Sequence, residues 1–416
     1  MLEILHNDDK FIYDDNNMIL YRSGEKINID SKIIKNSKKK YFSNVNFIMN
    51  NSCNMCCSYC YANKGTYNIE GNKLDIRAAK KVIDVLEKMR REHNEKSFHV
   101  TFFGGEPLLQ FEWIKEIVEY TKRNIENDAK IKWDIVTNGT LLNDKIAYFF
   151  KENKFTVTIS IDGDKEKHDL NRKLASGSGS YDIIANNIVK YKDYFQIVAR
   201  ITINDLNFDI TKCVKNIRKL GVHRIVLGVD IGMKSENFYY FEKKLKELCK
   251  YYTKCIKKGD YFIIDNITKI IFNLVFRRKM ISHCNAGVSY FAVSPQEKVY
   301  LCHRFVGKEI GEMFEIDDKL EKNFRETTNM WIEKKGSGVD DRVLNCQNCN
   351  IKNLCGGNCF YDSYMENNDL ISRVDRDCKL KRNLTLQVFN LILDLSVEER
   401  RNYLIYINNF FDKFRI

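Results

Sequence analysis

The chain has 416 residues, of which 44% are hydrophobic and 30% charged, as is typical of a globular protein larger than one ordinary domain. The N-terminal stretch is too polar for a signal peptide, and the longest apolar runs are too short to span a bilayer, so we expect a cytoplasmic protein with no membrane partner. The net charge of +12 is spread along the chain, with one dense run at Lys38-Lys39-Lys40, which argues against a nucleic-acid partner. Fourteen cysteines in such a protein indicate metal binding rather than disulfide bonds.

Residues 1–44 read as a small β-rich appendage, a lid of two or three strands. From residue 45 strands alternate with amphipathic helices, which predicts an α/β fold with a parallel sheet. In such a sheet the functional loops gather at the C-terminal ends of the strands. The expected appendage strands are 10–15, 18–22 and 26–29; the sheet strands are 45–49, 98–105, 132–139, 155–162, 196–204 and 223–230; the helices are 74–93, 109–126, 144–153, 181–194 and 208–220.

The loop after the first of these sheet strands carries Cys53, Cys57 and Cys60 in the spacing C-x3-C-x2-C. A structural zinc site normally has four protein ligands, whereas three thiolates suit a [4Fe–4S] cluster with one iron left open. A zinc knuckle is the alternative at this point.

Three more distinctive stretches follow the next three strands, so one pocket at the strand ends could hold all four loops. Gly104 and Gly105 allow close backbone approach to a ligand, and the Glu106 carboxylate suits an ammonium group, or else caps a helix. Asn138 and Ser160 suit a ribose or a carboxylate, or else cap turns.

Two further residues complete this candidate pocket. Asp162 either holds its own turn or contacts the ligand, and the sequence favours neither role over the other. Arg200, inside the fifth strand, pairs either with a ligand carboxylate or with a carboxylate of the barrel.

The cysteine spacing, with "GGEP", "TNGTLL" and "SIDGDKEKHDLNR", resembles the partial (β/α)6 barrel of radical S-adenosylmethionine (SAM) enzymes over residues 45–230. The resemblance is strongest to the branch that modifies peptides and proteins. It implies that Cys53, Cys57 and Cys60 hold a cluster whose open iron binds SAM. It also implies that Glu106 binds the SAM amino group, that Arg200 is a candidate partner of the SAM carboxylate, and that Tyr59 packs near the adenine.

Seven further cysteines lie between residues 284 and 378, where two zinc ribbons are the alternative. Their arrangement resembles the SPASM domain, which carries two auxiliary [4Fe–4S] clusters, so that three clusters are expected in all. The resemblance assigns an outer group and an inner group: Cys346, Cys349, Cys355 and Cys378 to the outer, and Cys284, Cys302 and Cys359 to the inner.

Seven thiolates cannot fill eight sites, because a further Cys seen in many relatives is missing after Cys284. The inner cluster should therefore have an open iron, unless His283, His303 or another residue closes it. Glu297 stands where the family has a glycine, which makes the local turn less certain.

The stretch 284–307 resembles maturases that form thioether crosslinks in Cys-rich ribosomal peptides, of the sactipeptide and ranthipeptide types. This implies reductive cleavage of SAM to a 5′-deoxyadenosyl radical, with the substrate thiolate on the open inner iron. The expected partners are a Cys-rich precursor peptide and a flavodoxin- or ferredoxin-type electron donor. The alternatives are a dehydrogenase of the anaerobic sulfatase-maturing type, oxidising Cys or Ser, and a non-enzymatic electron-transfer protein.

The expected organisation has five parts. The appendage is 1–44, the barrel 45–233, a helical bridge 234–280 with helices at 234–258 and 263–278, the SPASM domain 281–380, and two C-terminal helices 381–416. Cys56, Cys213, Cys249 and Cys255 fit no ligand spacing, so we expect buried, inert thiols.

Overall fold

The computed structural model describes residues 1–7, 9–22, 25–27, 42–70, 73–125, 129–204, 208–230, 232, 238–280, 282–335, 346 and 348–414. The run Lys38-Lys39-Lys40, the end of the expected strand 26–29 and the start of the expected helix 234–258 lie outside these ranges. Within these ranges, none of the helices has the length and apolar character needed to cross a membrane.

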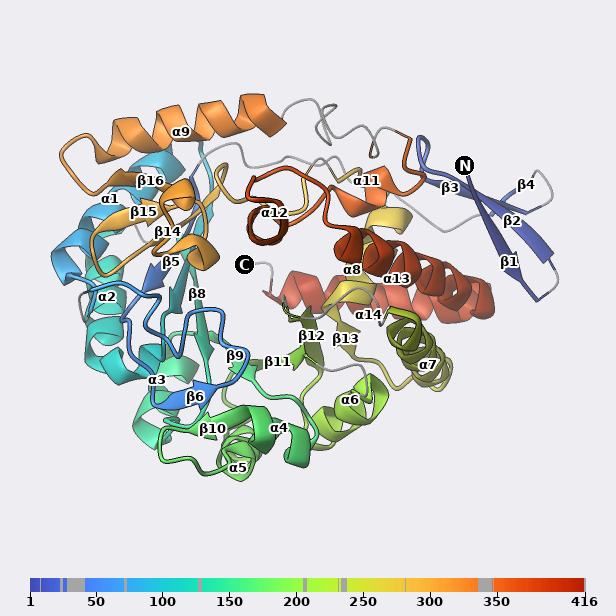
Figure 1. Ribbon diagram of the computed structural model, residues 1–416, viewed down its shortest axis with the longest axis horizontal. Helices are drawn as coiled ribbons and strands as arrows, with labels where there is room; N and C mark the ends of the chain where they lie inside the picture. Colours follow the sequence, from blue (N-terminus) through green and yellow to red (C-terminus); the bar gives the residue numbers. More distant parts are fainter. Residues whose placement is uncertain are drawn as a thin grey trace.

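One curved sheet forms the centre of the molecule, and the six predicted strands lie side by side in it (Figure 1). Their pairing is parallel throughout, as the alternating pattern predicts. The strands are β5 (Asn44–Ile48), β7 (Ser97–Phe103), β8 (Lys130–Thr137), β9 (Thr156–Ser160), β11 (Gln196–Ile203) and β12 (Arg224–Val229), with a seventh short parallel strand, β13 (Ile263–Ile264), beyond β12.

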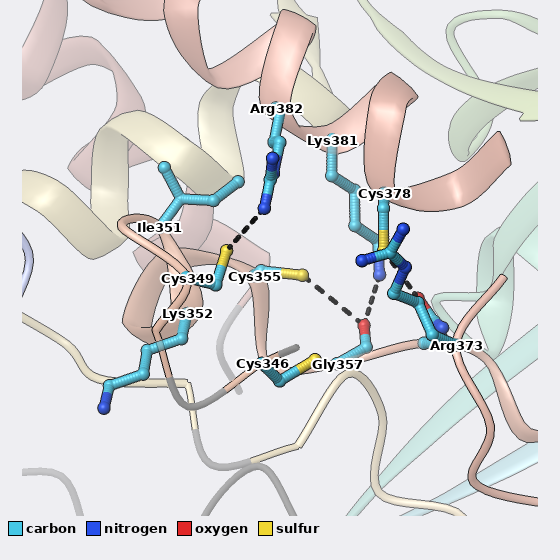
Figure 2. A pocket seen from close by; sticks show the side chains of 11 residues that line it. Cys346, Cys349, Ile351, Lys352, Cys355, Gly357, Arg373, Cys378, Lys381 and Arg382 are labelled. Carbon is cyan, nitrogen blue, oxygen red and sulfur yellow. Dashed lines mark hydrogen bonds between the residues drawn. The ribbon is translucent and has the colours of Figure 1, made fainter. Parts of the chain in front are cut away.

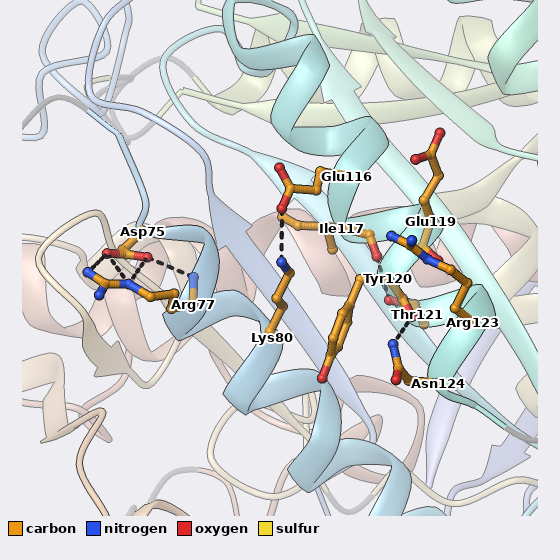
Figure 3. Close-up of polar contacts among 10 residues, drawn as sticks. All are labelled: Asp75, Arg77, Lys80, Glu116, Ile117, Glu119, Tyr120, Thr121, Arg123 and Asn124. Carbon is orange, nitrogen blue, oxygen red and sulfur yellow. Dashed lines mark hydrogen bonds and ion pairs between the residues drawn. The ribbon is translucent and has the colours of Figure 1, made fainter.

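The helices between these strands cover the outside of the sheet (Figure 1). They bury one apolar face each, because their apolar residues recur at helical spacing. Figure 3 shows polar side chains on the first two, where Lys80 Nζ lies 2.9 Å from Glu116 Oε1 and Asp75 caps the first helix. The helices are α1 (Ile76–Glu92), α2 (Phe111–Asn124), α3 (Asp144–Glu152), α4 (Lys165–Asn171), α5 (Tyr181–Tyr191) and α6 (Ile210–Lys219), with the short 3-10 helix η1 (Pro107–Gln110) before α2.

The inner face of the sheet differs from the outer face. On β9, Val157 and Ile159 are buried under the helices, whereas Thr156, Thr158 and Ser160 alternate with them and remain partly exposed. A strand turns successive side chains to opposite faces, so the inner face carries the polar set. The interior of the barrel is therefore polar, and ligand-binding side chains can point into it.

Three strands extend the sheet on the side of β5: β14 (Tyr290–Val293), β15 (Lys298–Tyr300) and β16 (Glu312–Glu315). β14 pairs parallel with β5, with Tyr290 opposite Asn44. β14 and β15 form a hairpin whose turn places Glu297 at φ 58°, a left-handed conformation that glycine adopts more easily. The expected turn therefore forms without the glycine.

The N-terminal appendage is a sheet of four strands, not of two or three: β1 (Leu2–His6), β2 (Asp9–Asp14), β3 (Ile19–Arg22) and β4 (Glu25–Lys26). It lies beside the helices α11 (Lys352–Cys355) and α13 (Asp375–Asp394) rather than over the barrel (Figure 1). Tyr13 packs against Phe389 of α13, with ring centroids 4.8 Å apart, so this sheet supports the C-terminal region.

The remaining helices follow the barrel. α13 contains Cys378 and runs through the boundary expected at residue 380, so the first predicted C-terminal helix begins earlier than its apolar spacing indicates. The helices are α7 (Phe238–Lys257), α8 (Asp265–Val275), α9 (Leu320–Lys335), α11 (Lys352–Cys355), α12 (Phe360–Asn367), α13 (Asp375–Asp394) and α14 (Val397–Phe414), with short 3-10 helices at η3 (His303–Phe305) and η4 (Glu309–Gly311).

Candidate functional site

The cysteine loop after β5 is held by a small two-stranded sheet. Its strand β6 (Met55–Cys57) pairs antiparallel with β10 (Arg172–Leu174), and Cys57 lies opposite Arg172. Neighbouring residues in a strand point to opposite faces. Accordingly Cys57 is half-buried, whereas Cys56 is exposed, and the expectation that Cys56 is buried is wrong.

The structure brings Cys53, Cys57 and Cys60 together, and all three are half-buried. Burial, together with the neighbouring Glu106, Cys57 and Cys60, raises the pKa of Cys53 to about 12. Such thiols ionise when they bind a metal, whose charge offsets the cost of burial. The donor set therefore fits an iron–sulfur cluster, and ligation remains a prediction.

The two glycines allow the GGEP stretch to pack closely against the cysteine loop. A Cβ on Gly105 would lie 2.1 Å from the Ser52 carbonyl oxygen, and one on Gly104 would lie 2.9 Å from the Asn50 carbonyl oxygen. Gly105 N donates to Asn50 O, and Glu106 N donates to Ser52 O. The close approach that these glycines permit is thus to the cysteine loop.

Glu106 is completely buried and ties the GGEP stretch to the end of β8. Oε1 accepts from Leu108 N at 3.0 Å and from the Thr137 hydroxyl at 2.6 Å, and Oε2 accepts from Asn138 N at 2.7 Å. Burial raises the pKa of this carboxyl, while these hydrogen bonds oppose the rise. A carboxylate has about four acceptor positions, so Oε2 retains one for a further donor.

Asn138 and Ser160 differ in their contacts. Asn138 donates to Asn54 Oδ1 at 2.8 Å, its Nδ2 lies 3.9 Å from Cys53 Sγ, and its Oδ1 accepts from Thr140 N. It therefore ties the loop after β8 to the cysteine loop. Ser160 ends β9 half-buried on the inner face of the sheet.

A second polar group joins the cysteine loop to the opposite side of the barrel. The Tyr59 hydroxyl donates to Asp162 Oδ2 at 2.6 Å and accepts from Arg172 Nη1 at 3.1 Å. Asp162 Oδ1 also accepts from Thr202 N at 3.0 Å, so Asp162 holds this junction. Sequence reasoning missed Arg172, although it ends the "HDLNR" stretch; its buried Nε has no hydrogen-bond partner in the described structure.

Arg200 lies on β11 directly beside Ser160 of β9. Its guanidinium extends toward β12, where a Cβ on Gly228 would lie 3.2 Å from Nη2. The Arg200 side chain is exposed, and although its carbonyl accepts from Ile161 N, its guanidinium makes no hydrogen bond or ion pair with a residue in the described ranges. Of the two partners that the sequence left open, the barrel carboxylate is thus not seen there, and binding of a ligand carboxylate stays a prediction.

In the C-terminal region, the inner group Cys284, Cys302 and Cys359 also comes together. Burial, together with Cys359 and Cys284, raises the pKa of Cys302 to about 12. Arg304 Nη1 donates to Cys359 Sγ at 3.4 Å, and its Nη2 pairs with Asp362 at 2.9 Å.

The two histidines considered as extra ligands have polar neighbours. His283 Nδ1 lies 3.2 Å from Lys381 Nζ. His303 Nδ1 lies 2.5 Å from the Tyr290 hydroxyl, which itself accepts from Asn46 Nδ2 at 2.7 Å. His303 Nδ1 therefore has two polar neighbours, the Tyr290 hydroxyl and Asn46 Nδ2, the latter at 3.2 Å.

The outer group Cys346, Cys349, Cys355 and Cys378 surrounds an open hollow of about 410 Å³ (Figure 2). All four thiols are half-buried. Arg382 Nη2 lies 3.7 Å from Cys349 Sγ, and Cys355 Sγ lies 3.6 Å from the Gly357 carbonyl oxygen.

Three cysteines outside these groups, Cys213, Cys249 and Cys255, are buried, as expected. Across the part of the chain that the structure describes, no three His, Cys, Asp or Glu side chains gather closely enough to hold a single metal ion. A [4Fe–4S] cluster is a different case, since each thiolate binds its own iron.

Comparison with known proteins gives three kinds of relative. The chain is 29% identical over 329 residues to a cysteine-type anaerobic sulfatase-maturating enzyme of Clostridium novyi, covering 74% of this chain and 85% of that enzyme. It is 34% identical over 219 residues to an uncharacterised protein of Methanocaldococcus jannaschii, covering 50% and 72%. It is 24% identical over 335 residues to the radical SAM cyclopropyl synthase TigE of Paramaledivibacter caminithermalis, covering 76% and 67%.

Solved structures share the fold. The structure of anSMEcpe with bound AdoMet (SAM) aligns with a TM-score of 0.71 at 21% identity, covering 84% of this chain and 98% of that one. Streptococcus suis SuiB bound to its precursor peptide SuiA aligns with a TM-score of 0.55 at 15% identity, covering 81% and 76%.

The family model "Radical SAM superfamily" matches residues 47–205, which contain the cysteine loop, the GGEP stretch and the loops after β8 and β9. With these relatives and this fold, the chain belongs to the radical SAM superfamily, whose members use SAM and a [4Fe–4S] cluster.

Proposed function

We propose that this protein is a radical SAM maturase that forms thioether crosslinks in a ribosomally made, Cys-rich peptide. In this proposal Cys53, Cys57 and Cys60 hold the SAM cluster, and two auxiliary clusters occupy the inner and outer cysteine groups. The assignment of thioether formation rests on the inner group, which offers three thiols where a cubane cluster needs four ligands.

The residues at the barrel mouth have complementary parts in binding SAM. The free acceptor position on Glu106 Oε2 suits the ammonium of SAM, a charge-assisted hydrogen bond. Arg200 has the positive charge that a carboxylate needs, with Ser160 beside it on the next strand. Bound together, SAM and its reduced cluster supply a 5′-deoxyadenosyl radical that removes a hydrogen atom from a substrate carbon.

At the inner group, His303 is engaged by its neighbours: its Nδ1 lies 2.5 Å from the Tyr290 hydroxyl and 3.2 Å from Asn46 Nδ2. In this proposal the fourth iron position is therefore filled by a substrate thiolate rather than by this imidazole. Arg304, 3.4 Å from Cys359 Sγ, adds positive charge that lowers the pKa of Cys359 against the larger, opposing effect of burial.

A second candidate is a dehydrogenase of the anaerobic sulfatase-maturing type, which would oxidise a Cys or Ser side chain to an aldehyde. The similarity to the Clostridium novyi enzyme, over 85% of its length, favours it. Solved structures of anSMEcpe with a bound Kp18Cys peptide, and of SuiB with SuiA, support a peptide as substrate under either candidate.

The deciding experiment is anaerobic reconstitution with iron and sulfide, followed by incubation with SAM, dithionite and a Cys-rich peptide encoded beside the gene. Thioether formation predicts 5′-deoxyadenosine and a peptide lighter by two hydrogen atoms, with one thiol no longer alkylated. An aldehyde that reacts with hydrazide would instead favour the second candidate. Absence of 5′-deoxyadenosine would exclude both.

Two substitutions separate ligand loss from general damage. Cys57→Ala should abolish 5′-deoxyadenosine formation, because a cluster held by two thiolates is not retained. Cys213→Ala, which removes a buried thiol outside the three groups, should retain cleavage. Loss of all cluster absorbance in Cys213→Ala would show that the assignment of ligands is wrong.

A further inference from the structure

The outer hollow has an unusual distribution of charge. Its lining includes the four cysteines and four cationic side chains, and it contains no Asp or Glu (Figure 2). The cations form what we call the basic rim: Lys352, Arg373, Lys381 and Arg382. We propose that the basic rim is the docking surface of an acidic one-electron carrier protein, of the ferredoxin or flavodoxin type.

The rim is held in place by local contacts. Lys381 Nζ donates to the Gly357 carbonyl oxygen, and Arg373 pairs with Asp375. The Arg382 side chain points toward Cys349, and Arg382 is also exposed, so its charge faces both the hollow and the solvent. Fixed positive charges around a recess attract an acidic partner and orient it as it arrives.

The position of the hollow suits electron exchange. The four thiols are half-buried in an open recess, so a carrier can approach a group bound there closely. The outer group is also close to the inner group along the chain, because only residues 356–358 lie between Cys355 and Cys359. Exchange at this point moves one electron and no atoms: the reduced carrier loses one electron and the maturase gains it.

This inference rests on the proposed function, since it assumes that a cluster occupies the outer group. A purely structural role for the rim is the competing explanation, in which the cations only offset the charge of the thiolates. The two differ in one respect. Docking requires that an acidic carrier bind more weakly when rim charges are removed, whereas charge compensation does not.

The test uses the reconstituted full-length protein and a two-cluster ferredoxin of strongly negative net charge. Lys352→Gln combined with Arg382→Gln should weaken ferredoxin binding roughly tenfold at low salt, measured by calorimetry, and should flatten its salt dependence. The rate of cluster reduction by ferredoxin, followed by stopped-flow absorbance, should fall in parallel. Arg382→Lys, which keeps the charge, should retain binding.

Two controls make the result specific. Lys122→Gln removes an exposed cation from α2, on the far side of the barrel in Figure 1, and should leave ferredoxin affinity unchanged. Reduced methyl viologen, a small cation, should reduce the rim variant as fast as the unmodified protein. If Arg382→Gln lowers iron content, Lys352→Gln alone carries the binding test.

Unchanged ferredoxin affinity in the rim variants would overturn the inference, as would an equal loss in Lys122→Gln. Slower reduction by methyl viologen would also overturn it, because it would indicate damage to the cluster. Failure of the proposed function looks different: the unmodified protein would form no 5′-deoxyadenosine with methyl viologen, whatever the ferredoxin affinity.

Discussion

At the scale of single residues, the barrel mouth depends on side chains that join loops as well as face the ligand. Glu106 and Asn138 could be placed in one pocket from the sequence, because both follow strands of a parallel sheet. Arg172 could not, because its approach to Tyr59 requires the pairing of β6 with β10, and nothing in either segment specifies the other. The sequence likewise does not show that Glu106 is fully enclosed by three donors.

Gly105 provides a residue-scale test of the loop junction. Gly105→Ala should lower the free energy of unfolding by about 1–3 kcal/mol, because the new methyl group would lie 2.1 Å from the Ser52 carbonyl oxygen. It should also lower the iron bound at the SAM cluster after reconstitution. In Gly177→Ala nothing lies within 4 Å of the new Cβ, so only backbone strain is added at φ +89°, and iron content should not change. Equal iron in both variants would contradict the junction.

Asp134 on β8 provides a residue-scale pH test. Burial raises its pKa from 3.8 to about 6, against the opposing effects of a Thr156 hydrogen bond and of Arg224 and Lys132. The folded state therefore binds this proton more tightly than the unfolded chain does, so stability from this group is present below about pH 4 and is lost as the pH rises through 6.

Asp134→Asn should therefore raise the free energy of unfolding by about 1–2 kcal/mol near pH 8 and leave it nearly unchanged near pH 4, measured by urea denaturation. Asp144 is a matched control with the opposite sign, since its hydrogen bond with Lys190 lowers its pKa. Asp144→Asn should give no stabilisation near pH 8. If Asp134→Asn instead had a lower free energy of unfolding than the unmodified protein near pH 8, folding would favour the ionised form of Asp134.

At the scale of elements, the strand and helix pattern of residues 45–230 predicts the barrel well, because each helix has one apolar face and each strand ends in a turn. Elements that lack such periodicity were missed or misplaced. In β1 the apolar Leu5 is exposed, which breaks the alternation that marks a half-buried strand. The first turns of α13, residues 375–383, are polar, so they carry no apolar stripe that would predict a helix. The pairing of β14 with β5 is specified only by the folded chain.

The N-terminal sheet offers an element-scale test. Asp15 Oδ2 accepts from Asn353 N at 3.1 Å, and Asn353 lies in α11, beside two of the outer cysteines. Asp15→Ala should lower the free energy of unfolding by about 1–3 kcal/mol, because it leaves the Asn353 N–H unsatisfied. It should also reduce iron at the outer group selectively, measured as iron per chain and by the spectrum of the remaining clusters.

Asp14 is the matched control for this test, because it caps only the exposed turn at Asn16 and Asn17. Asp14→Ala should keep the iron content of the unmodified protein. If Asp15→Ala kept it as well, the N-terminal sheet would not support the outer group.

At the scale of the whole molecule, the barrel and the cysteine-rich region share one sheet. The continuous sheet from β13 to β16 includes the barrel strands and the β14–β15 hairpin, and Cys284 and Cys302 flank that hairpin. The sheet therefore fixes the inner group relative to the barrel mouth through backbone hydrogen bonds. The proposed function, in which the inner group holds the substrate and the radical forms at the barrel mouth, requires such a fixed relation.

A shared sheet predicts shared unfolding. Of the three tryptophans, Trp133 is buried in the barrel and Trp331 is buried against the cysteine-rich region, each 4% exposed. Variants that keep one of these two, with the others changed to Phe, report each region separately by fluorescence. In each variant of the reduced apoprotein, the fluorescence transition in urea should coincide with that of far-UV circular dichroism. An earlier transition for Trp331 alone would mean that the hairpin strands detach from β5 before the barrel unfolds, and that the distance between the two reaction sites is set by the clusters rather than by the sheet.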